Sequence, residues 1–588
     1  MSTTPFDHLK RIPPIWIALL VFVAFLLLRL PFRADFLLNW DSVNFALGTH
    51  LFDLEHHQPH PPGYIGYVAL GWILNHFTVD ANAGLTLLSA VGGAAAPAAF
   101  FLLAALFVPR AYALMGSVLL GVSPVVWYYS SVALSYSLEL ALGLLFLWAG
   151  YLARKRLSLP HLLAATALLV VLGAVRQTGG LLLTPLWLYL VWAFPWRERY
   201  RAGALLVAGN LAWLLPLFYL SGGVQPFFRY LSEQTALAVA PTSVFALEAG
   251  GLTQNLLLVA FGIGLGLNFG LLVLVASLIR GRQAYGVLRG DGAFFALWLA
   301  PAMATYLFVH TGQVGYVLLV LPFLFLLTSI ALRGLVEGGE APAESTTAGV
   351  TAQPSPGRTP RYAVAGVMAV LTVGSATLFY STPPAIALTA YGDSPEVRDD
   401  RMRSLLGFLP AYRLVGIAGG YFTEGWRQYD IEANDRHWRE MTRFLNRFDP
   451  ETTAILTTPD PGGSFRHLTY YLPEHAVYGI GRTLHGGFGH LFTAGGQTSD
   501  YHVAGLEAAD NELPLPPAVE RLVIPDAELR EALREHAADT PVEEVRLPHG
   551  HPVLVAEVAP GSTLSFEEAT GLNPRWAVME TPRTVVDN

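Results

Sequence analysis

The chain of 588 residues is 53% hydrophobic and only 14% charged, whereas an ordinary globular domain is about 25% charged. This composition argues against a soluble fold for the whole chain. A net charge of −8 without a clustered basic face excludes nucleic-acid binding, and the absence of cysteine excludes disulfides, thiolate metal sites and a thiol nucleophile.

Apolar runs follow one another between residues 14 and 332, each bounded by charges or turn formers. A helix needs about 20 apolar residues to cross a bilayer. Lys and Arg gather at alternate connections between the runs, which the positive-inside rule assigns to the cytoplasm. This alternation predicts about eleven spans, with the N-terminus inside and the first span retained. The predicted spans are 14–32, 82–108, 111–129, 137–153, 160–175, 179–195, 202–220, 253–279, 292–309, 314–332 and 361–380.

The stretch Pro62–Phe77 is apolar enough to be counted as a further span. Counting it would turn the basic clusters at 154–156 and 197–201 outward, so we expect it to rest on the outer surface as an amphipathic helix. Three polar stretches then lie outside: residues 33–81, residues 221–252 and everything after about residue 383.

Composition divides the chain into four parts. Residues 1–335 form the transmembrane core, 336–360 a flexible cytoplasmic linker, 361–382 the last transmembrane helix, and 383–588 a soluble extracytoplasmic domain. Short β-like runs and helical segments alternate in the last part, which predicts an α/β domain. The runs are Thr453–Thr458, Ala476–Ile480, Leu522–Ile524 and Val553–Val558, and the helical segments are Arg436–Phe448 and Asp526–Ala537.

Asp41 lies between Trp40 and Ser42 in the first outer loop, next to the predicted bilayer surface. A partly desolvated carboxylate there could act as general base toward an acceptor hydroxyl. It could equally cap the helix that begins Asp-Ser-Val-Asn-Phe, because Asp is a favourable N-cap residue. The loop alone leaves both interpretations open.

Three histidines, His56, His57 and His60, lie close together in the same loop. They could bind a metal ion or an anion, or they could be a solvated cluster that binds nothing. Prolines on both sides of His60 restrict its backbone, which suits a positioned side chain.

Two charged residues fall at the outer ends of middle spans. A carboxylate such as Glu139 is costly at the edge of hydrocarbon unless it is paired or faces a cavity, so it could be a metal ligand or could snorkel to the interface. Arg176 interrupts two apolar helices, and we expect Gly179 and Gly180 to break the second helix at membrane depth. Such breaks are tolerated where they line a cavity, and a guanidinium there could hold a phosphate bidentately.

His310 offers another imidazole at the outer start of the tenth span, and the phenol of Tyr316 follows it. Both could face a ligand. The alternative is an interfacial aromatic belt, which tyrosine often forms.

Together these residues resemble the motifs of the GT-C superfamily of membrane glycosyltransferases, particularly its bacterial protein O-mannosyltransferase-like and aminoarabinose-transferase-like members. The resemblance covers about residues 14 to 335. It implies an all-α polytopic membrane enzyme of about eleven spans with an extracytoplasmic α/β domain. It also implies a polyprenyl-phosphate sugar donor and catalysis on the outer face of the bacterial cytoplasmic membrane.

The resemblance assigns roles to individual residues. Asp41 matches the first-loop aspartate that acts as general base, and His60, before its paired prolines, matches a basic residue that meets the donor phosphate. Arg176 resembles the Arg of an Arg-Pro-Thr-Gly segment, and the segment from His310 to Tyr316 resembles one before a late span, so both are expected at the phosphate.

The metal dependence stays open on these residues. Glu139 resembles an acidic position that is sometimes a divalent-metal ligand, and His57 is a second possible ligand. The family often has Asp-Glu where this chain has Asp41-Ser42, and Gln177 replaces a common proline. Both a divalent metal ion and the absence of any cofactor are therefore compatible with the sequence.

We expect an inverting hexosyl- or pentosyltransferase whose acceptor is a glycan, a lipid or a protein. The chief alternative is a transporter or a flippase for lipid-linked glycans. Such proteins usually show internal repeats and polar groups near the bilayer midplane, whereas the candidate residues here gather at the outer edge. An outer-face polymerase or ligase shares the topology but would be expected to use arginine-rich outer loops, and this chain has few outer arginines in its membrane region. The presence of both Asp41 and His60 in the first loop argues against a non-catalytic scaffold for the outer domain.

Overall fold

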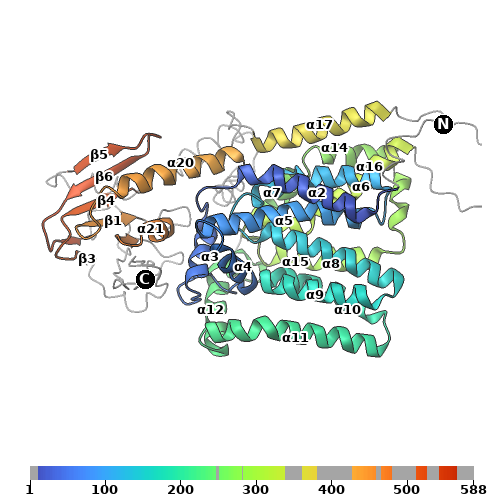
Figure 1. The fold of residues 1–588 in the computed structure, drawn as a ribbon, viewed down its shortest axis with the longest axis horizontal. Coiled ribbons are helices and arrows are strands. Elements are labelled where there is room, and N and C mark those ends of the chain that lie inside the picture. The colour runs from blue at the N-terminus through green and yellow to red at the C-terminus, as the bar shows by residue number, and fades with distance from the viewer. Residues whose placement is uncertain are drawn as a thin grey trace, which may run out of the picture.

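The computed structural model describes residues 11–246, 251–280, 282–337, 361–380, 427–457, 465–479, 512–525 and 542–565. A bundle of helices forms one part of the molecule, and a sheet with two helices lies beyond one end of it (Figure 1). The predicted linker from residue 338 onward and the predicted helix Asp526–Ala537 lie outside the described residues.

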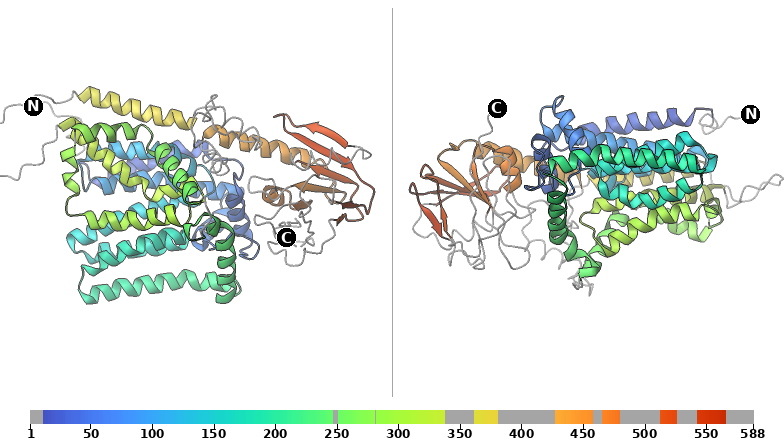
Figure 2. Two further views of the ribbon diagram at one scale, coloured as in Figure 1. Left: turned by 180° about the vertical axis from the view of Figure 1, so that it is seen from behind. Right: turned by 90° about the horizontal axis from the view of Figure 1, so that it is seen from below.

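Most helices of the bundle run roughly side by side along the long axis of the molecule (Figures 1 and 2). The helices of the bundle are α2 (Pro14–Arg29), α5 (Ala81–Ala104), α6 (Arg110–Gly121), α7 (Pro124–Tyr129), α8 (Tyr136–Arg156), α9 (Leu159–Val175), α10 (Gln177–Trp192), α11 (Trp196–Leu220), α13 (Gly251–Leu267), α14 (Gly270–Arg280), α15 (Gly292–Phe308), α16 (Leu321–Glu337) and α17 (Arg361–Tyr380). Shorter elements lie between them: η1 (Leu30–Phe32), α3 (Trp40–His50), α4 (Ile65–Asn75), α12 (Val224–Gln234), η2 (Thr235–Val239), η3 (Ala240–Thr242), η4 (Val244–Ala246), η5 (Arg282–Leu288) and η6 (Val314–Leu319).

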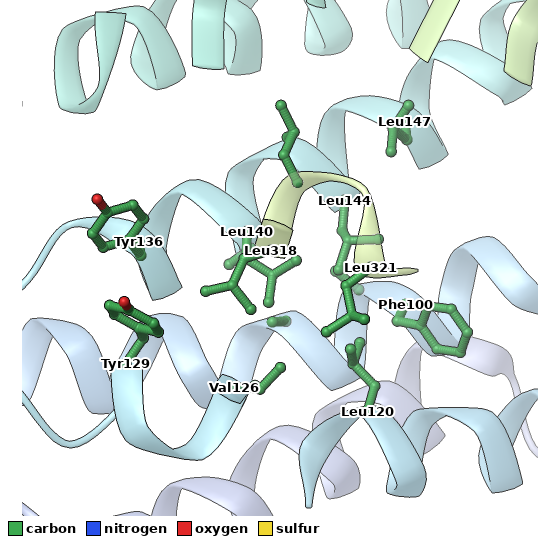
Figure 3. Packing of buried hydrophobic residues seen from close by; sticks show 14 of the residues in the cluster. Phe100, Leu120, Val126, Tyr129, Tyr136, Leu140, Leu144, Leu147, Leu318 and Leu321 are labelled. Carbon is green, nitrogen blue, oxygen red and sulfur yellow. The ribbon is translucent and has the colours of Figure 1, made fainter. Parts of the chain in front are cut away.

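Helix α5 is the buried centre of the bundle and contacts α2, α4, α6 and α8. A Cβ atom on Gly92 would lie 2.6 Å from the backbone nitrogen of Leu138, so only glycine allows α5 to approach α8 this closely. Small residues permit such approach between membrane helices. Figure 3 shows part of the apolar cluster of the bundle, including Phe100 of α5 and Leu140 and Leu144 of α8, with Tyr129 and Tyr136 at one edge.

Four described helices are long and apolar enough to cross a membrane, and a bent pair makes a possible fifth. The four are Pro14–Phe32, Ala81–Ala104, Tyr136–Arg156 and Trp196–Leu220. The apolar helices α9 and α15 occupy other predicted spans but are shorter. Among the described residues, fewer helices than the eleven predicted spans are long enough by themselves to cross a membrane.

The span predicted over 253–279 is wrong as a single helix. The chain bends there by 88° between α13 and α14. Asn268 lies at the bend with a φ of 38°, and its side chain accepts hydrogen bonds from the Phe269 N–H and from Ser375 Oγ. Asn tolerates the left-handed conformation because its short amide can bond locally, and a hydropathy average does not detect one such residue.

The span predicted over 111–129 is also interrupted. Helix α6 ends at Gly121 and α7 starts at Pro124, and proline is favourable at the first position of a helix. The Ser123 hydroxyl between them donates to the Gly266 carbonyl at 2.7 Å, which ties the break to the end of α13. The predicted span 314–332 similarly begins as the 3₁₀ turn η6 before α16.

The stretch Pro62–Phe77 contains α4, whose 11 residues are too few to cross a bilayer. Helix α4 packs on α5 and α9, and it leaves Trp72 and Ile73 exposed on its outer side. The prediction that this stretch is not a span therefore agrees with the structure.

At one end of the bundle, basic side chains contact the ends of neighbouring helices. Arg110, at the start of α6, donates to the Ile12 carbonyl just before α2. Lys155, at the end of α8, pairs with Asp291 before α15 at 2.7 Å. The polar loop that follows α2 lies at the opposite end, beside the sheet (Figure 1).

The C-terminal part contains a five-stranded sheet with the strand order β2-β1-β4-β6-β5. Strands β2 (Ala476–Gly479), β1 (Thr453–Thr457) and β4 (Arg521–Ile524) are parallel, whereas β4, β6 (Pro552–Glu557) and β5 (Val542–Arg546) are antiparallel. A separate pair joins β3 (Glu512–Pro514) to β7 (Thr563–Ser565). Helices α20 (Gln428–Leu445) and α21 (Phe465–Tyr471) pack through Trp438, Met441 and Leu468 on Ile455 and Val523 of the sheet.

The same two helices hold the first loop of the bundle. The Asp435 carboxylate of α20 accepts the backbone N–H groups of Asp35 at 3.0 Å and Phe36 at 2.9 Å, and the Tyr471 hydroxyl of α21 accepts that of Leu37 at 2.7 Å. Arg439 pairs with Asp35 at 2.6 Å. The backbone N–H groups of residues 35–37 are thus held by side chains about 400 positions later in the chain.

Replacing Asp435 by Ala should release this segment, because two backbone N–H groups lose their acceptor. Each such loss costs about 1–3 kcal/mol, which corresponds to a roughly 5- to 150-fold faster local opening. Hydrogen–deuterium exchange of the peptide around residues 33–40, in the full-length protein in detergent, measures this rate. The variant Glu451→Ala, at an exposed position of the same region, is the control. Unchanged exchange in Asp435→Ala would show that Asp435 does not hold this segment.

Candidate active site

Asp41 lies in the first turn of α3 without capping it. Asn39 is the N-cap, and its Oδ1 accepts the Ser42 N–H at 2.9 Å. The interpretation of Asp41 as a helix cap is therefore wrong. The positive end of the helix dipole stabilises the negative charge of its carboxylate. The side chain is 30% exposed.

Two side chains from distant segments approach the Asp41 carboxylate. Gln313, just before η6, donates from Nε2 to Oδ2 at 3.0 Å. His60 Nδ1 lies 3.6 Å from Oδ1, slightly beyond hydrogen-bond distance. The first loop and the segment before η6 therefore meet at this carboxylate.

His60 is buried between the rings of Phe45 and Tyr64, with ring centroids 5.2 and 4.9 Å away. A short β-bridge between Asp53 and Gln58 closes the turn that precedes it. Burial lowers the pKa of His60; Asp41 opposes this shift, and Arg176 and Arg466 add to it. The imidazole is consequently neutral at pH 7.

Arg176 lies at the junction of α9 and α10 and is almost fully buried. Its Nε pairs with Glu139 Oε2 at 2.9 Å, and its Nη1 donates to Ser135 Oγ at 3.0 Å. The predicted helix break at Gly179 and Gly180 is wrong, since α10 runs through both and the chain breaks at Arg176 itself.

The glycines serve close packing instead. A Cβ atom on Gly179 would lie 2.3 Å from Glu139 Oε1, and one on Gly180 would lie 2.8 Å from the Cα atom of Gly173. Glycine at 179 therefore gives the Glu139 carboxylate room to reach Arg176.

Three tyrosine rings surround the Arg176 guanidinium. Its Cζ lies 3.9 Å from the ring centroid of Tyr136, 5.3 Å from that of Tyr316 and 5.6 Å from that of Tyr64, within the range of cation–π attraction. Burial raises the pKa of Tyr64, on which the charges of Arg176, Asp41 and Glu139 also act. These residues therefore share one electrostatic neighbourhood.

His310 and Tyr316 belong to the same neighbourhood. Their rings lie 5.7 Å apart, edge to face, and His310 Nδ1 hydrogen-bonds Thr242 Oγ1 at 2.7 Å. Burial, reinforced by Arg176, lowers the pKa of His310 to about 4, so this imidazole is neutral as well. The structure thus brings together Asp41, His60, Arg176, His310 and Tyr316, all of which the sequence predicts as site residues.

Glu139 and His57, the two possible metal ligands, do not come together in one metal-binding group. The Glu139 carboxylate is occupied by Arg176. His57 adopts a positive φ of 58° in the turn after Asp53. Neither belongs to the one group of three or more His, Asp or Glu side chains that could hold a metal among the described residues.

Arg466 of α21 is a site residue that the sequence did not reveal. It is fully buried, donates from Nη2 to the His56 carbonyl at 2.7 Å, and places its Cζ 5.3 Å from the ring of Trp40. No local motif marks it, because it reaches the first loop only through the docking of the C-terminal helices.

Several polar atoms of this cluster are shielded from solvent and lack a hydrogen-bond partner within the described part of the chain. They are His60 Nδ1, Gln313 Oε1 and both amide atoms of Gln177. Native proteins leave few such atoms unpaired, and each one needs an explanation. A polar ligand bound here would supply the missing partners.

The structure is similar to that of ArnT from Cupriavidus metallidurans in the apo state, with a TM-score of 0.52 and 14% identity over 92% of this chain and 97% of ArnT. ArnT from the same organism bound to undecaprenyl phosphate gives a TM-score of 0.49 at 12% identity, with coverages of 92% and 97%. The apo oligosaccharyltransferase of Archaeoglobus fulgidus gives 0.44 at 13% identity, over 88% of this chain and 70% of that protein. No protein-family model and no curated protein matches the sequence.

At 14% identity, the similarity to apo ArnT is one of fold, and it extends over nearly the whole length of both chains. The resemblance found in the sequence motifs is thereby confirmed at the level of the fold, which this chain shares with apo ArnT.

Proposed function

We propose that this protein is an integral membrane glycosyltransferase that transfers a sugar from a polyprenyl-phosphate donor to an acceptor hydroxyl. The observation that carries the proposal is the placement of a partly exposed carboxylate, Asp41, beside buried cationic and imidazole groups at one end of an apolar bundle. The shared fold with ArnT supports the same class of reaction.

In the proposed reaction, Asp41 takes the proton of the acceptor hydroxyl as its oxygen attacks the anomeric carbon. The new bond joins the acceptor oxygen to that carbon, and the bond from the carbon to the phosphate oxygen breaks. The lipid phosphate leaves with the bonding electron pair. A single displacement of this kind inverts the anomeric configuration, and general-base catalysis contributes typically 10²–10⁴-fold.

The leaving phosphate gathers negative charge, which positioned donors stabilise. Arg176 is the first candidate, since Glu139 and Ser135 engage two of its nitrogens and hold the guanidinium in one orientation. His60 and His310, neutral at pH 7, would contribute N–H donors, and Tyr316 would contribute a phenol. Arg466 adds a second guanidinium at the first loop.

A lipid-phosphate donor also accounts for the position of the cluster at the end of the bundle. The prenyl chain stays in hydrocarbon, and the sugar phosphate reaches the polar loop. Because the basic clusters lie at the opposite end, the positive-inside rule supports a site on the outer face, and the membrane that we propose is the bacterial cytoplasmic membrane. The acceptor would be a glycan, a lipid or a protein.

Replacing Asp41 by Asn should lower the transfer rate by roughly 10²–10⁴-fold, because the amide cannot accept the proton. The measurement is sugar transfer from polyprenyl-phosphate donors by the purified protein in liposomes. The control is Asp80→Asn, since Asp80 caps α5 through the Ala83 N–H and Asn caps equally well.

Full transfer activity in Asp41→Asn would remove Asp41 from the role of base. Movement of intact donor across the bilayer, without any transfer of the sugar, would instead favour a flippase.

Replacing Arg176 by Lys should lower transfer by roughly 10- to 100-fold or more, because lysine keeps the charge but loses the planar set of donors. The matched control is Arg229→Lys, on an exposed arginine that pairs with Glu55 at 3.2 Å. Thermal unfolding separates this loss from a loss of stability. Wild-type activity in a folded Arg176→Lys protein would contradict the assignment.

Replacing Arg466 by Ala should raise the KM for the donor more than it lowers kcat, provided that this guanidinium binds the donor phosphate before reaction. Arg466→Lys should recover part of the affinity, and Arg447→Ala, at an exposed position of the same region, serves as control. An unchanged KM in Arg466→Ala would restrict Arg466 to a structural role.

A further inference from the structure

Three histidines meet in the C-terminal region, outside the candidate active site. His437 lies on α20, and His549 and His551 lie where the chain turns from β5 to β6. One ring nitrogen from each lies within 4.8 Å of the other two. His437 Nδ1 and His549 Nε2 are 3.1 Å apart.

The outer nitrogens of two of these rings are held by acceptors. His549 Nδ1 hydrogen-bonds the Glu440 carboxylate, and Glu440 also accepts the His549 backbone N–H at 2.8 Å. His551 Nε2 donates to the Pro525 carbonyl at 2.9 Å. Since a carbonyl or carboxylate oxygen only accepts, these bonds fix the tautomers: His549 turns the lone pair of Nε2 inward and His551 that of Nδ1.

This arrangement is the one that metal-binding histidines show, in which the second ring nitrogen donates to a carboxylate or a backbone carbonyl. A neutral imidazole is the form that ligates metals.

The spacing suits a tetrahedral ion. With metal–nitrogen bonds of about 2.0–2.1 Å, neighbouring ligand atoms of a tetrahedral zinc site lie about 3.3 Å apart, close to the 3.1 Å between the His437 and His549 nitrogens. Since the chain has no cysteine, the ligands must be nitrogen or oxygen.

We propose that His437, His549 and His551 form a binding site for a divalent transition metal ion of the zinc class, with Glu440 orienting His549 and one coordination position left for water or another ligand. The ion would join the β5–β6 turn to α20. Asp435 of the same helix holds the backbone of the first loop. The bound ion would therefore stabilise α20, the helix on which these hydrogen bonds depend.

The test uses the full-length protein in detergent, with an affinity tag that contains no histidine. After removal of metal with a chelator, the protein is dialysed against Zn²⁺ and its zinc content is measured by mass spectrometry. We expect about one zinc per chain in the wild type and in the control His76→Ala, whose ring is exposed at the end of α4, and much less in His549→Ala and His551→Ala.

Two further measurements guard against misfolded variants. Zn²⁺ should raise the Tm of the wild type but not that of His551→Ala, because only a native site binds the ion. Glu440→Gln, which keeps the three ligands, should weaken zinc affinity about 10- to 100-fold. Co²⁺ in the wild-type site should show the visible absorption of a tetrahedral complex.

Wild-type protein that retains no zinc after dialysis would overturn the proposal. Zinc content in folded His549→Ala and His551→Ala equal to that of His76→Ala would overturn it as well. Neither result depends on whether the protein transfers a sugar.

Discussion

The buried guanidinium of Arg176 sets a strict physical demand on this structure. A charge removed from water is costly unless it is paired and hydrogen-bonded. Glu139 and Ser135 of one segment supply the ion pair and the hydrogen bond, and the rings of Tyr64 just before α4, Tyr136 of α8 and Tyr316 of η6 lie around the guanidinium. The side chain at the α9–α10 junction therefore contacts residues at the ends of α4, α8 and η6, and Gly179 is needed because the carboxylate occupies the space of its Cβ.

The second organising feature is the docking of the C-terminal helices on the first loop. Asp435 and Tyr471 fix the backbone of residues 35–37, directly before the helix that carries Asp41. Phe36 and Trp40 pack against the apolar core beneath the sheet. The position of Asp41 thus depends on both parts of the chain, and α20 connects this loop with the histidine cluster on its other side.

Hydropathy and charge predict those helices that are long apolar runs bounded by charges or turn formers. The apolar runs of α2, α5, α8 and α11 are long and continuous, and the strands β1, β4 and β6 were likewise visible as short apolar runs. The bend at Asn268 and the break before Pro124 could not be predicted in this way, because a window average weighs composition and not the conformation of one residue. The sequence also predicts a break at Gly179 and Gly180, although both glycines lie inside α10.

By itself, the sequence determined which residues could react: Asp41, His60, Arg176, His310 and Tyr316 stand out as polar groups at the ends of apolar runs. Only the tertiary structure decided how they combine. It assigned the helix cap to Asn39 and left Asp41 available, paired Glu139 with Arg176, and brought in Gln313 and Arg466 from distant segments. The physical reason is that hydropathy depends on neighbours along the chain, whereas ion pairs and hydrogen bonds depend on neighbours in space.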